Sequence, residues 1–376
     1  MRLFYLIDSL VPGGAETSLA ALAPHLVAGG VDLEVGYFHD RPGLQSVVLD
    51  AGARATLIGE CGGRVGRVKA VRRLVQMRQP DLVHTTLWEA NIAGRIGARL
   101  ARTRVVSSIV SDPYGPEHRK SEHASPWKVS AAHGLDAATA QLVRRFHANS
   151  AASADTMSRR LHVQRHLIDV VPRGRDAKLL GMRTSQRRDE LRSALGLSEA
   201  SLVLAVGRHD PAKGFDHLIR AAPILRKTAP NATIVMAGRD GNSTKELHAL
   251  VEEHRASPYV RFLGHRDDIA DLLCAADVVV APSRREGLPG TLIEALALEC
   301  PIVASDLPSI REVTGPFASL VSPTDRVGLA TAIGGILAEP EKAASRAADG
   351  RQRFLERFTI ERCADGMLAF YERAME

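Results

Sequence analysis

Cysteine, aromatic residues and long hydrophobic runs are all scarce in this chain of 376 residues. The four cysteines lie far apart and form neither a metal-ligand spacing nor a disulfide framework, which favours a reducing compartment. Aromatic residues make up only 4%, and no nucleic-acid-binding motif accompanies them, so a nucleic-acid partner is disfavoured. The sequence also lacks the roughly 18 consecutive apolar residues that span a bilayer and the longer apolar region of a signal peptide. We therefore expect a globular protein of the cytoplasm.

The positive charge is concentrated in the first half of the chain. Residues 1–180 carry 24 Lys and Arg against 16 Asp and Glu, whereas residues 181–376 carry 25 against 27. This asymmetry indicates an anionic partner, either a membrane surface or a phosphorylated substrate. Residues 65–78 form a helical pattern with an apolar stripe, and its basic residues surround the stripe. The pattern fits a helix that covers a sheet, and it also fits a helix whose basic face meets anionic lipid.

The order of the expected elements predicts an α/β fold with two similar-sized halves. Apolar strands alternate with amphipathic helices along the whole chain, which indicates parallel sheets covered on both faces. A chain of this length exceeds the size of one hydrophobic core, so we expect two domains, residues 1–178 and 188–358. The polar, Arg-rich residues 178–188 are the candidate linker. Two facing parallel sheets place a ligand at the carboxyl ends of their strands.

The stretch 281–301, APSRREGLPGTLIEALALECP, is the strongest candidate site. It reads as a strand end, a Gly-rich turn and a helix start, and that arrangement aims unpaired backbone N–H groups at one point. Glu286 lies in the loop and Glu294 in the helix. Because a carboxylate repels phosphate, we expect the two glutamates to accept hydrogen bonds from hydroxyl groups of a sugar or ribose. By itself, such a glutamate pair is expected about once by chance in a chain of this composition.

A second candidate loop, GRHDPAKG at residues 207–214, joins a strand to a helix. Arg208 and Lys213 converge there on the helix start, and two cations with a helix dipole favour a diphosphate. The alternative is a solvated turn with ordinary surface charges. By contrast, Gly13 and Gly14 do not form a G-x-G-x-x-G fingerprint, which argues against dinucleotide binding. The long loop 111–127 contains two histidines without a third ligand, so we expect no metal site in it.

Six ordered motifs make the chain resemble the retaining glycosyltransferases of the two-Rossmann-domain (GT-B) type, specifically glycosyltransferase family 4. They are GGAE at 13–16, LVHTTLWEAN at 82–91, VPRGRD at 171–176, GRHDPAKG at 207–214, FLGHRDDI at 262–269 and PSRREGLPGTLIEALALECPIVASD at 282–306. The resemblance covers nearly the whole chain. It implies an acceptor-binding first domain, onto which the helix in 359–376 packs back, and a second domain that binds a nucleotide-sugar donor.

The resemblance also implies roles for individual residues. Arg208 and Lys213 would grip the diphosphate, Glu294 the ribose hydroxyls and Glu286 the hydroxyls of the sugar ring. The remaining donor contacts would come mainly from backbone groups of His265, Arg266, Gly287, Leu288, Pro289, Gly290 and Thr291, with Gly13 and Gly14 approaching the diphosphate from the first domain. The donor is a co-substrate, and the resemblance implies neither a cofactor nor a catalytic metal, because cations and helix N–H groups stabilise the departing diphosphate.

On the acceptor side the sequence departs from the family pattern. Many relatives carry a histidine at the end of the strand that corresponds to residues 105–110, but this chain reads VVSSIVSDP there. It also has Thr86 where a second histidine often follows His84. Asp112 or His118 would take the vacant place, or the contact differs.

We expect a hexosyltransferase that moves a sugar from a nucleotide-diphosphate donor to a hydroxyl of a glycan, lipid-linked or polysaccharide acceptor. We expect it to act in the cytoplasm, peripherally at the inner face of a membrane. The alternatives are a sugar phosphorylase or nucleotide-sugar epimerase of similar fold, and an inactive nucleotide-sugar-binding partner subunit. The donor base, the donor sugar and the acceptor stay open at this point.

Overall fold

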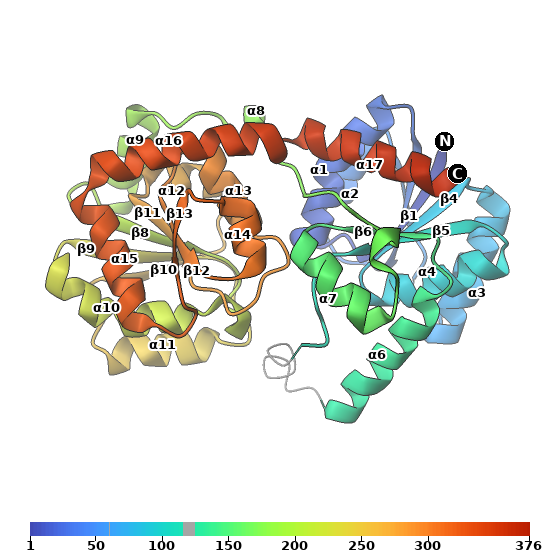
Figure 1. Ribbon diagram of the computed structural model, residues 1–376, viewed down its shortest axis with the longest axis horizontal. Coiled ribbons are helices and arrows are strands. Elements are labelled where there is room, and N and C mark those ends of the chain that lie inside the picture. The colour runs from blue at the N-terminus through green and yellow to red at the C-terminus, as the bar shows by residue number, and fades with distance from the viewer. Residues whose placement is uncertain (60, 116–124) are drawn as a thin grey trace. The chain divides into compact units, whose positions relative to one another are not determined.

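A computed structural model describes residues 1–59, 61–115 and 125–376 of the chain. The described residues divide into two compact units (Figure 1). The first unit comprises 1–115, 125–176 and 358–376, and the second comprises 177–357. The domain ranges expected from the sequence are 1–178 and 188–358.

The first unit is built on a seven-stranded sheet with the order β3-β2-β1-β4-β5-β6-β7, in which every neighbouring pair is parallel. Its strands are β1 (Arg2–Ser9), β2 (Asp32–His39), β3 (Arg54–Leu57), β4 (Leu82–Thr86), β5 (Arg104–Ile109), β6 (Arg145–Ala148) and β7 (Ile168–Val170). Its helices are α1 (Gly14–Ala28), α2 (Gln45–Asp50), α3 (Arg64–Arg78), α4 (Trp88–Leu100), α6 (Pro126–Ala140), α7 (Ala151–Leu161) and α17 (Ile360–Met375), with a 3-10 turn at Arg165–Leu167.

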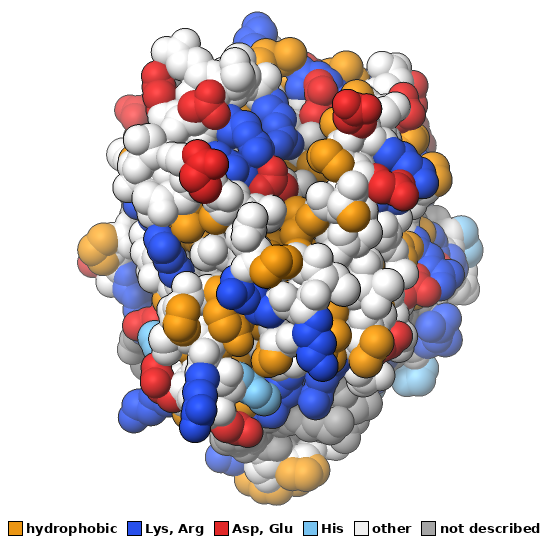
Figure 2. Space-filling model, turned by 90° about the vertical axis from the view of Figure 1, so that its left-hand side faces the viewer, with side chains coloured by type: hydrophobic (Ala, Val, Ile, Leu, Met, Phe, Trp, Pro, Cys, Tyr) orange, Lys and Arg blue, Asp and Glu red, His pale blue; other side chains and the backbone are white. Residues whose placement is uncertain are grey.

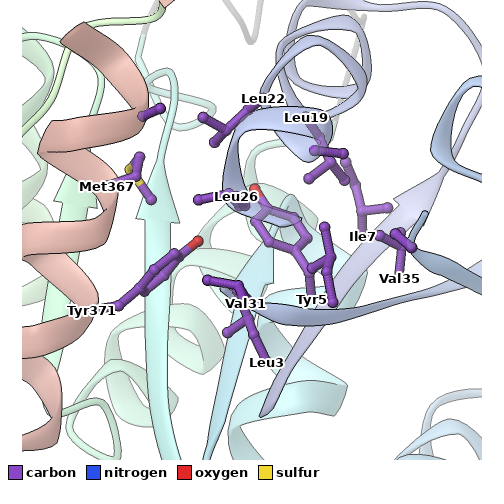
Figure 3. Close-up of a cluster of buried hydrophobic side chains, with 14 of the residues drawn as sticks. Leu3, Tyr5, Ile7, Leu19, Leu22, Leu26, Val31, Val35, Met367 and Tyr371 are labelled. Atoms are coloured by element: carbon purple, nitrogen blue, oxygen red, sulfur yellow. The ribbon is translucent and has the colours of Figure 1, made fainter. Parts of the chain in front are cut away.

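The C-terminal helix α17 belongs to the core of the first unit. Figure 3 shows Met367 and Tyr371 projecting from α17 toward side chains of α1 and the sheet, among them Leu22 and Tyr5. The chain enters this helix through a backbone bridge between Arg175 and Thr359, which joins the segment after β7 to the start of α17. Burial of the apolar face of α17 therefore ties the end of the chain to its first strand.

The second unit is built on a six-stranded parallel sheet with the order β10-β9-β8-β11-β12-β13. Its strands are β8 (Ser201–Val206), β9 (Ala232–Ala237), β10 (Val260–Gly264), β11 (Val278–Ala281), β12 (Ile302–Ser305) and β13 (Ala318–Val321). Its helices are α8 (Ala177–Leu180), α9 (Ser185–Leu195), α10 (Phe215–Thr228), α11 (Thr244–Glu253), α12 (Ile269–Ala275), α13 (Gly290–Ala297), α14 (Pro308–Thr314), α15 (Arg326–Ala338) and α16 (Pro340–Arg357), with a 3-10 turn at Pro211–Lys213. Two parallel sheets covered by helices confirm the predicted α/β class.

One expectation about local structure is wrong in its bounds. The sequence pattern predicts a helix over 133–145 and a strand-like stretch at 146–150, whereas α6 spans Pro126–Ala140 and β6 already begins at Arg145, where it pairs with β5 and β7. The candidate linker 178–188 contains α8 and the start of α9. Arg187 and Arg188 of α9 form ion pairs with Asp271 and Asp277 of the second unit. No helix in the described part of the chain is long and apolar enough to cross a membrane.

Candidate functional site

Two loops of the second unit meet at the carboxyl edge of its sheet. The strand order runs outward from β8 in one direction and from β11 in the other, so the β8–β11 neighbours form the switch point of the sheet. Ligands of open α/β sheets bind at the carboxyl ends of strands at such a point. The loop after β8, residues 207–214, and the loop after β11, residues 282–289, both leave from this edge. These are the two loops that the sequence predicts as the site.

The loop after β8 is a short, internally bonded turn. Asp210 accepts a hydrogen bond from the backbone N–H of Ala212 at 2.9 Å, and this bond caps the 3-10 turn Pro211–Lys213. Gly214 follows with a φ of +65°, a conformation that favours glycine. A Cβ atom at Gly214 would also collide with the carbonyl oxygen of Pro282 in the neighbouring loop. The turn therefore presents Lys213 from a fixed backbone, while Arg208 pairs with Asp210 at 2.7 Å and has a side chain that is 59% exposed.

Lys213 and Glu286 form the centre of the site. The Nζ atom of Lys213 lies 2.7 Å from Oε1 of Glu286, and the Ser283 hydroxyl donates to the same oxygen at 2.8 Å. The hydroxyl of Ser309 donates to the backbone oxygen of Glu286 at 3.0 Å. The Glu286 side chain is only 11% exposed, whereas that of Lys213 is 31% exposed. A fixed carboxylate beside an accessible ammonium can accept hydrogen bonds from hydroxyl groups and hold a phosphate with the cation.

Helix α13 supplies backbone donors next to this pair. The helix begins at Gly290, its N-cap residue is Pro289, and no side chain caps it. The first N–H groups of a helix have no intrahelical acceptor, so those of Gly290 and Thr291 point out of the helix start. Leu288 is buried and Gly287 is partly exposed, and Glu294 lies one turn further along α13, also partly exposed.

Two of the predicted donor-binding residues, His265 and Arg266, follow β10, the edge strand of the same sheet. His265 has a side chain that is 57% exposed, and it lies 3.4 Å from Asp267. The guanidinium of Arg266 donates through Nε to Asp268 at 2.8 Å. The carbonyl of Gly264 accepts a hydrogen bond from the N–H of Gly238 after β9. This loop is therefore joined to the neighbouring loop at the same edge of the sheet.

In the first unit, Gly13 and Gly14 lie at the start of α1. Gly13 is the N-cap residue of α1 and has an extended conformation. The guanidinium of Arg173, from the segment after β7, donates to the carbonyl oxygen of Gly14 at 3.3 Å. Arg173 belongs to the VPRGRD motif, from which no role for this arginine is predicted.

His84 lies inside the first unit and is fully buried. Its Nδ1 lies 2.8 Å from the Tyr371 hydroxyl and its Nε2 lies 2.7 Å from Oγ of Ser108. Ser108 in turn lies 2.8 Å from Nδ1 of His147, whose Nε2 lies 2.9 Å from the Val171 carbonyl oxygen. Burial lowers the pKa of His84 well below its usual value and that of His147 to about 4. Nδ1 of His84 thus joins β4 to α17, while its Nε2 bonds to Ser108 of the neighbouring strand β5.

The other two predicted acceptor residues lie around the long loop after β5. Asp112 forms an ion pair with Arg160 at 2.9 Å and accepts a hydrogen bond from the N–H of Tyr114. His118 lies outside the described residues. The acceptor contacts of His84, Asp112 and His118 stay predictions.

A polar cluster that the sequence analysis missed lies at the carboxyl ends of β1 and β2. Asp8 accepts a hydrogen bond from the N–H of Ala90 at 2.7 Å, at the start of α4. Next to it, Glu89 pairs with Nε2 of His39 at 2.8 Å and with Arg67 at 2.6 Å. Burial, together with the nearby charge of Glu89, raises the pKa of Asp8 to about 7. The signal in the sequence is that Asp8 and His39 stand at the ends of adjacent strands.

No group of three His, Cys, Asp or Glu side chains in residues 1–59, 61–115 and 125–376 is placed to hold a metal ion.

Two family models and several curated proteins match the sequence. Residues 12–179 match the model for Glycosyltransferase Family 4, and residues 187–353 match Glycosyl transferases group 1. Glycogen synthase of Mycobacterium tuberculosis is 34% identical over 173 residues, which are 45% of this chain and 42% of that protein. The D-inositol 3-phosphate glycosyltransferase of Rhodococcus opacus is 30% identical over 309 residues, 78% of this chain and 67% of that protein. The match thus spans less than half of the first of these relatives.

Solved structures share the fold. The complex of Anabaena HepE with UDP-glucose has a TM-score of 0.86 at 24% identity and covers 99% of this chain and 100% of that one. Sucrose-phosphate synthase from Thermosynechococcus elongatus has a TM-score of 0.80 at 22% identity, with 99% of both chains covered. At this level of identity the likeness concerns the fold alone. From the two models and the inositol-phosphate relative together, the chain belongs to the group 1 and family 4 glycosyltransferases, with two Rossmann-like domains of the GT-B type.

Proposed function

We propose that this protein is a retaining hexosyltransferase that moves a sugar from a nucleotide-diphosphate donor to a hydroxyl of a glycan, lipid-linked or polysaccharide acceptor. The observation that carries the proposal is the contact between Lys213 and Glu286 at the switch point of the second sheet. One loop supplies a cation for a diphosphate and the other supplies a held carboxylate for hydroxyl groups. A nucleotide sugar contains both of these chemical groups within one small molecule.

Each group at the site has a distinct part in the proposed reaction. Breaking the anomeric bond leaves an oxocarbenium-like sugar and adds negative charge to the departing diphosphate. Arg208, Lys213 and the N–H groups at the start of α13 would stabilise that charge, which lowers the barrier because it develops in the transition state. Glu286 would hold the ring hydroxyls and Glu294 the ribose hydroxyls. The departing phosphate would take the acceptor proton on the same face, so the anomeric configuration would be retained.

The direct test is turnover of a panel of uridine-, guanosine-, adenosine- and thymidine-diphosphate hexoses by the purified protein. We expect one donor to release nucleoside diphosphate, and we expect Lys213→Met and Glu286→Gln each to slow turnover by roughly 100-fold or more, as loss of a group that stabilises transition-state charge does. Lys342→Met is the matched control, because Lys342 pairs with Glu339 on the surface with 82% of its side chain exposed. Proton NMR of the product anomer tests retention. Turnover that requires inorganic phosphate and no sugar acceptor would favour a phosphorylase, and absence of turnover with every donor would contradict the proposal.

We further propose that the first unit meets an anionic membrane surface through α3 and its surroundings. Val65 and Met77 of α3 are 69% and 64% exposed, and Leu57 at the end of β3 is 43% exposed. The helix also carries six basic side chains, Arg64, Arg67, Lys69, Arg72, Arg73 and Arg78. Basic residues beside exposed apolar ones suit an anionic lipid surface. On the face of the molecule that Figure 2 draws, basic and acidic side chains are interspersed, in contrast to the basic side chains that α3 carries.

Flotation with phosphatidylcholine vesicles, with and without anionic lipid, tests this attachment. We expect binding only to the anionic vesicles at low salt, and we expect Arg72→Glu together with Arg73→Glu to abolish it. Failure to float with anionic vesicles at low salt would contradict the membrane proposal and leave the donor site untouched.

A further inference from the structure

We propose that Arg284 is a positioning residue of the donor site, which fixes the turn that carries Lys213 and compensates the charge of Asp216 beside it. This inference rests on the proposed function of the second unit as a donor-binding domain. Nothing in the family motifs quoted above assigns a role to Arg284, which lies two residues before Glu286 in the loop after β11.

Arg284 contacts every part of the turn that precedes Lys213. Its backbone N–H donates to the carbonyl oxygen of Ala212 at 2.8 Å, and its guanidinium donates to the carbonyl oxygen of Pro211 at 2.6 Å. The two residues before Lys213 therefore have their carbonyl groups bound by one arginine from the opposite loop. Hydrogen bonds from a charged donor are stronger than neutral ones, so the guanidinium contact restrains the turn more than a backbone contact would.

The same guanidinium pairs with Asp216, which lies in the first turn of α10. The distance between the two side chains is 2.6 Å, and they are only 25% and 17% exposed. Burial opposes ionisation of Asp216, but the hydrogen bond and the charge of Arg284 outweigh it and hold the pKa below its usual value. Asp216 thus stays negative at neutral pH, at the start of the helix that follows Lys213.

A negative charge at this place has two opposing effects. It stabilises the helix, because carboxylates are favourable near a helix N-terminus. It would also repel a diphosphate held by Lys213, which lies three residues earlier in the chain. The guanidinium of Arg284 compensates that repulsion and also restrains the turn through its hydrogen bond. Arg284 therefore has an electrostatic effect and a geometric effect, and substitutions can separate the two.

The experiment compares Arg284→Gln, Asp216→Asn, the double variant and Arg284→Lys with the wild type. Arg187→Gln is the matched control, since Arg187 also pairs with an aspartate, Asp271, in the second unit. Hydrogen exchange of the amides of residues 212–214 is measured first, without any donor. Kinetics with the donor that the wild-type protein turns over fastest then separate kcat from KM.

We expect Arg284→Gln to speed exchange of these amides and to raise the donor KM by about 10-fold or more, because the charge of Asp216 then repels the diphosphate without compensation. In the double variant Asp216 is neutral, so the KM should return toward the wild-type value while the fast exchange persists. Arg284→Lys should restore the KM better than the exchange, because lysine keeps the charge but not the planar fork. Arg187→Gln should change neither quantity.

If the amides of residues 212–214 exchange at the wild-type rate in Arg284→Gln, the geometric part of the inference is overturned. If the donor KM of this variant is unchanged, the electrostatic part is overturned. If Arg284→Gln does not fold, the same two readings are taken on Arg284→Lys and Asp216→Asn, where a KM and exchange both equal to wild type would overturn the inference. Because the exchange measurement uses no donor, it tests whether Arg284 restrains the turn even if no nucleotide sugar is turned over. Absence of turnover would refute the proposed function separately.

Discussion

Asp8 should make the stability of the first unit fall as the pH rises through neutrality. The carboxyl group is partly buried at the start of α4 and lies near the charge of Glu89, so its pKa is raised to about 7. In the unfolded chain an aspartate titrates near 3.9. A group whose folded pKa is raised contributes stability that is fully present below the unfolded pKa and is lost as the pH rises through the folded pKa.

The size of the effect follows from the two pKa values. A difference of roughly three pKa units corresponds to at most about 4 kcal/mol of unfolding free energy, lost between about pH 4 and pH 7. The carboxylate is partly hydrated, which reduces the effect to about 2 kcal/mol or somewhat more. Asp8→Asn removes the titration and keeps an oxygen that can accept the hydrogen bond from Ala90. The stability of the variant relative to the wild type should therefore rise steadily between about pH 4 and pH 7 and be highest at pH 8.

Tryptophan fluorescence during urea unfolding measures this in the right part of the molecule. The chain has two tryptophans, Trp88 and Trp127, and both belong to the first unit. The quantity to plot is the unfolding free energy of Asp8→Asn minus that of the wild type, because other titrating groups cancel in the difference. Asp155→Asn serves as the control, since Asp155 forms an exposed pair with Arg165. A difference that stays constant from pH 5 to pH 8 would refute the reasoning.

Three further predictions concern buried groups. The pKa of His147 is lowered to about 4, so only the unfolded chain takes up a proton as the pH falls from 6.5 to 4. The wild type should therefore lose up to about 3 kcal/mol of unfolding free energy over this range. His147→Gln should lose this pH dependence in urea titrations at a series of pH values. Arg95→Met leaves the buried carboxylate of Asp136 without its cationic partner at 2.5 Å, so urea unfolding should show a loss of about 3 to 5 kcal/mol, largely recovered by adding Asp136→Leu. Gly214→Ala forces a left-handed backbone and a collision with a carbonyl oxygen, so it should lower the melting temperature measured by circular dichroism, by about 1 to 3 kcal/mol in stability, and raise the donor KM. The respective argument would be contradicted if His147→Gln kept the wild-type loss of unfolding free energy between pH 6.5 and 4, if Arg95→Met were as stable as the wild type, or if Gly214→Ala had the wild-type melting temperature.

The parallel-sheet architecture could be predicted because its signal is local and repeated. Strands such as β8 and β11 are buried on both faces and read as continuous apolar runs, with Gly-containing turns at their ends. The errors occur where a distant partner decides the structure. The helix predicted over 133–145 ends at Ala140, and Arg145 belongs to β6, which pairs with β5 and β7. The arginines of α9 look like linker residues until Asp271 and Asp277 pair with them.

The candidate site could be predicted as two loops but not as a set of contacts. Spacing along the chain places Lys213 and Glu286 after two strands, and only the strand order makes these strands neighbours. The sequence therefore suggests the chemistry of each residue without showing that the two bond to one another. The contacts of Arg284 could not be predicted from the sequence either, because its three partners lie about 70 positions earlier in the chain.

The hydrogen bonds of β5 show how this protein uses the strand on which many relatives carry a histidine. The two serines that this strand carries are both used inside the first unit: Ser107 accepts from Arg95 at 2.9 Å, and Ser108 lies between His84 and His147. The polar groups of this strand thus hold the helices onto the sheet. If a histidine there assists the reaction in relatives, its part in this protein would fall to the predicted Asp112 or His118, to the second unit or to the polar cluster around Glu89. The kinetic cost of Lys213→Met should then exceed that of any single substitution on β5 that leaves the first unit folded.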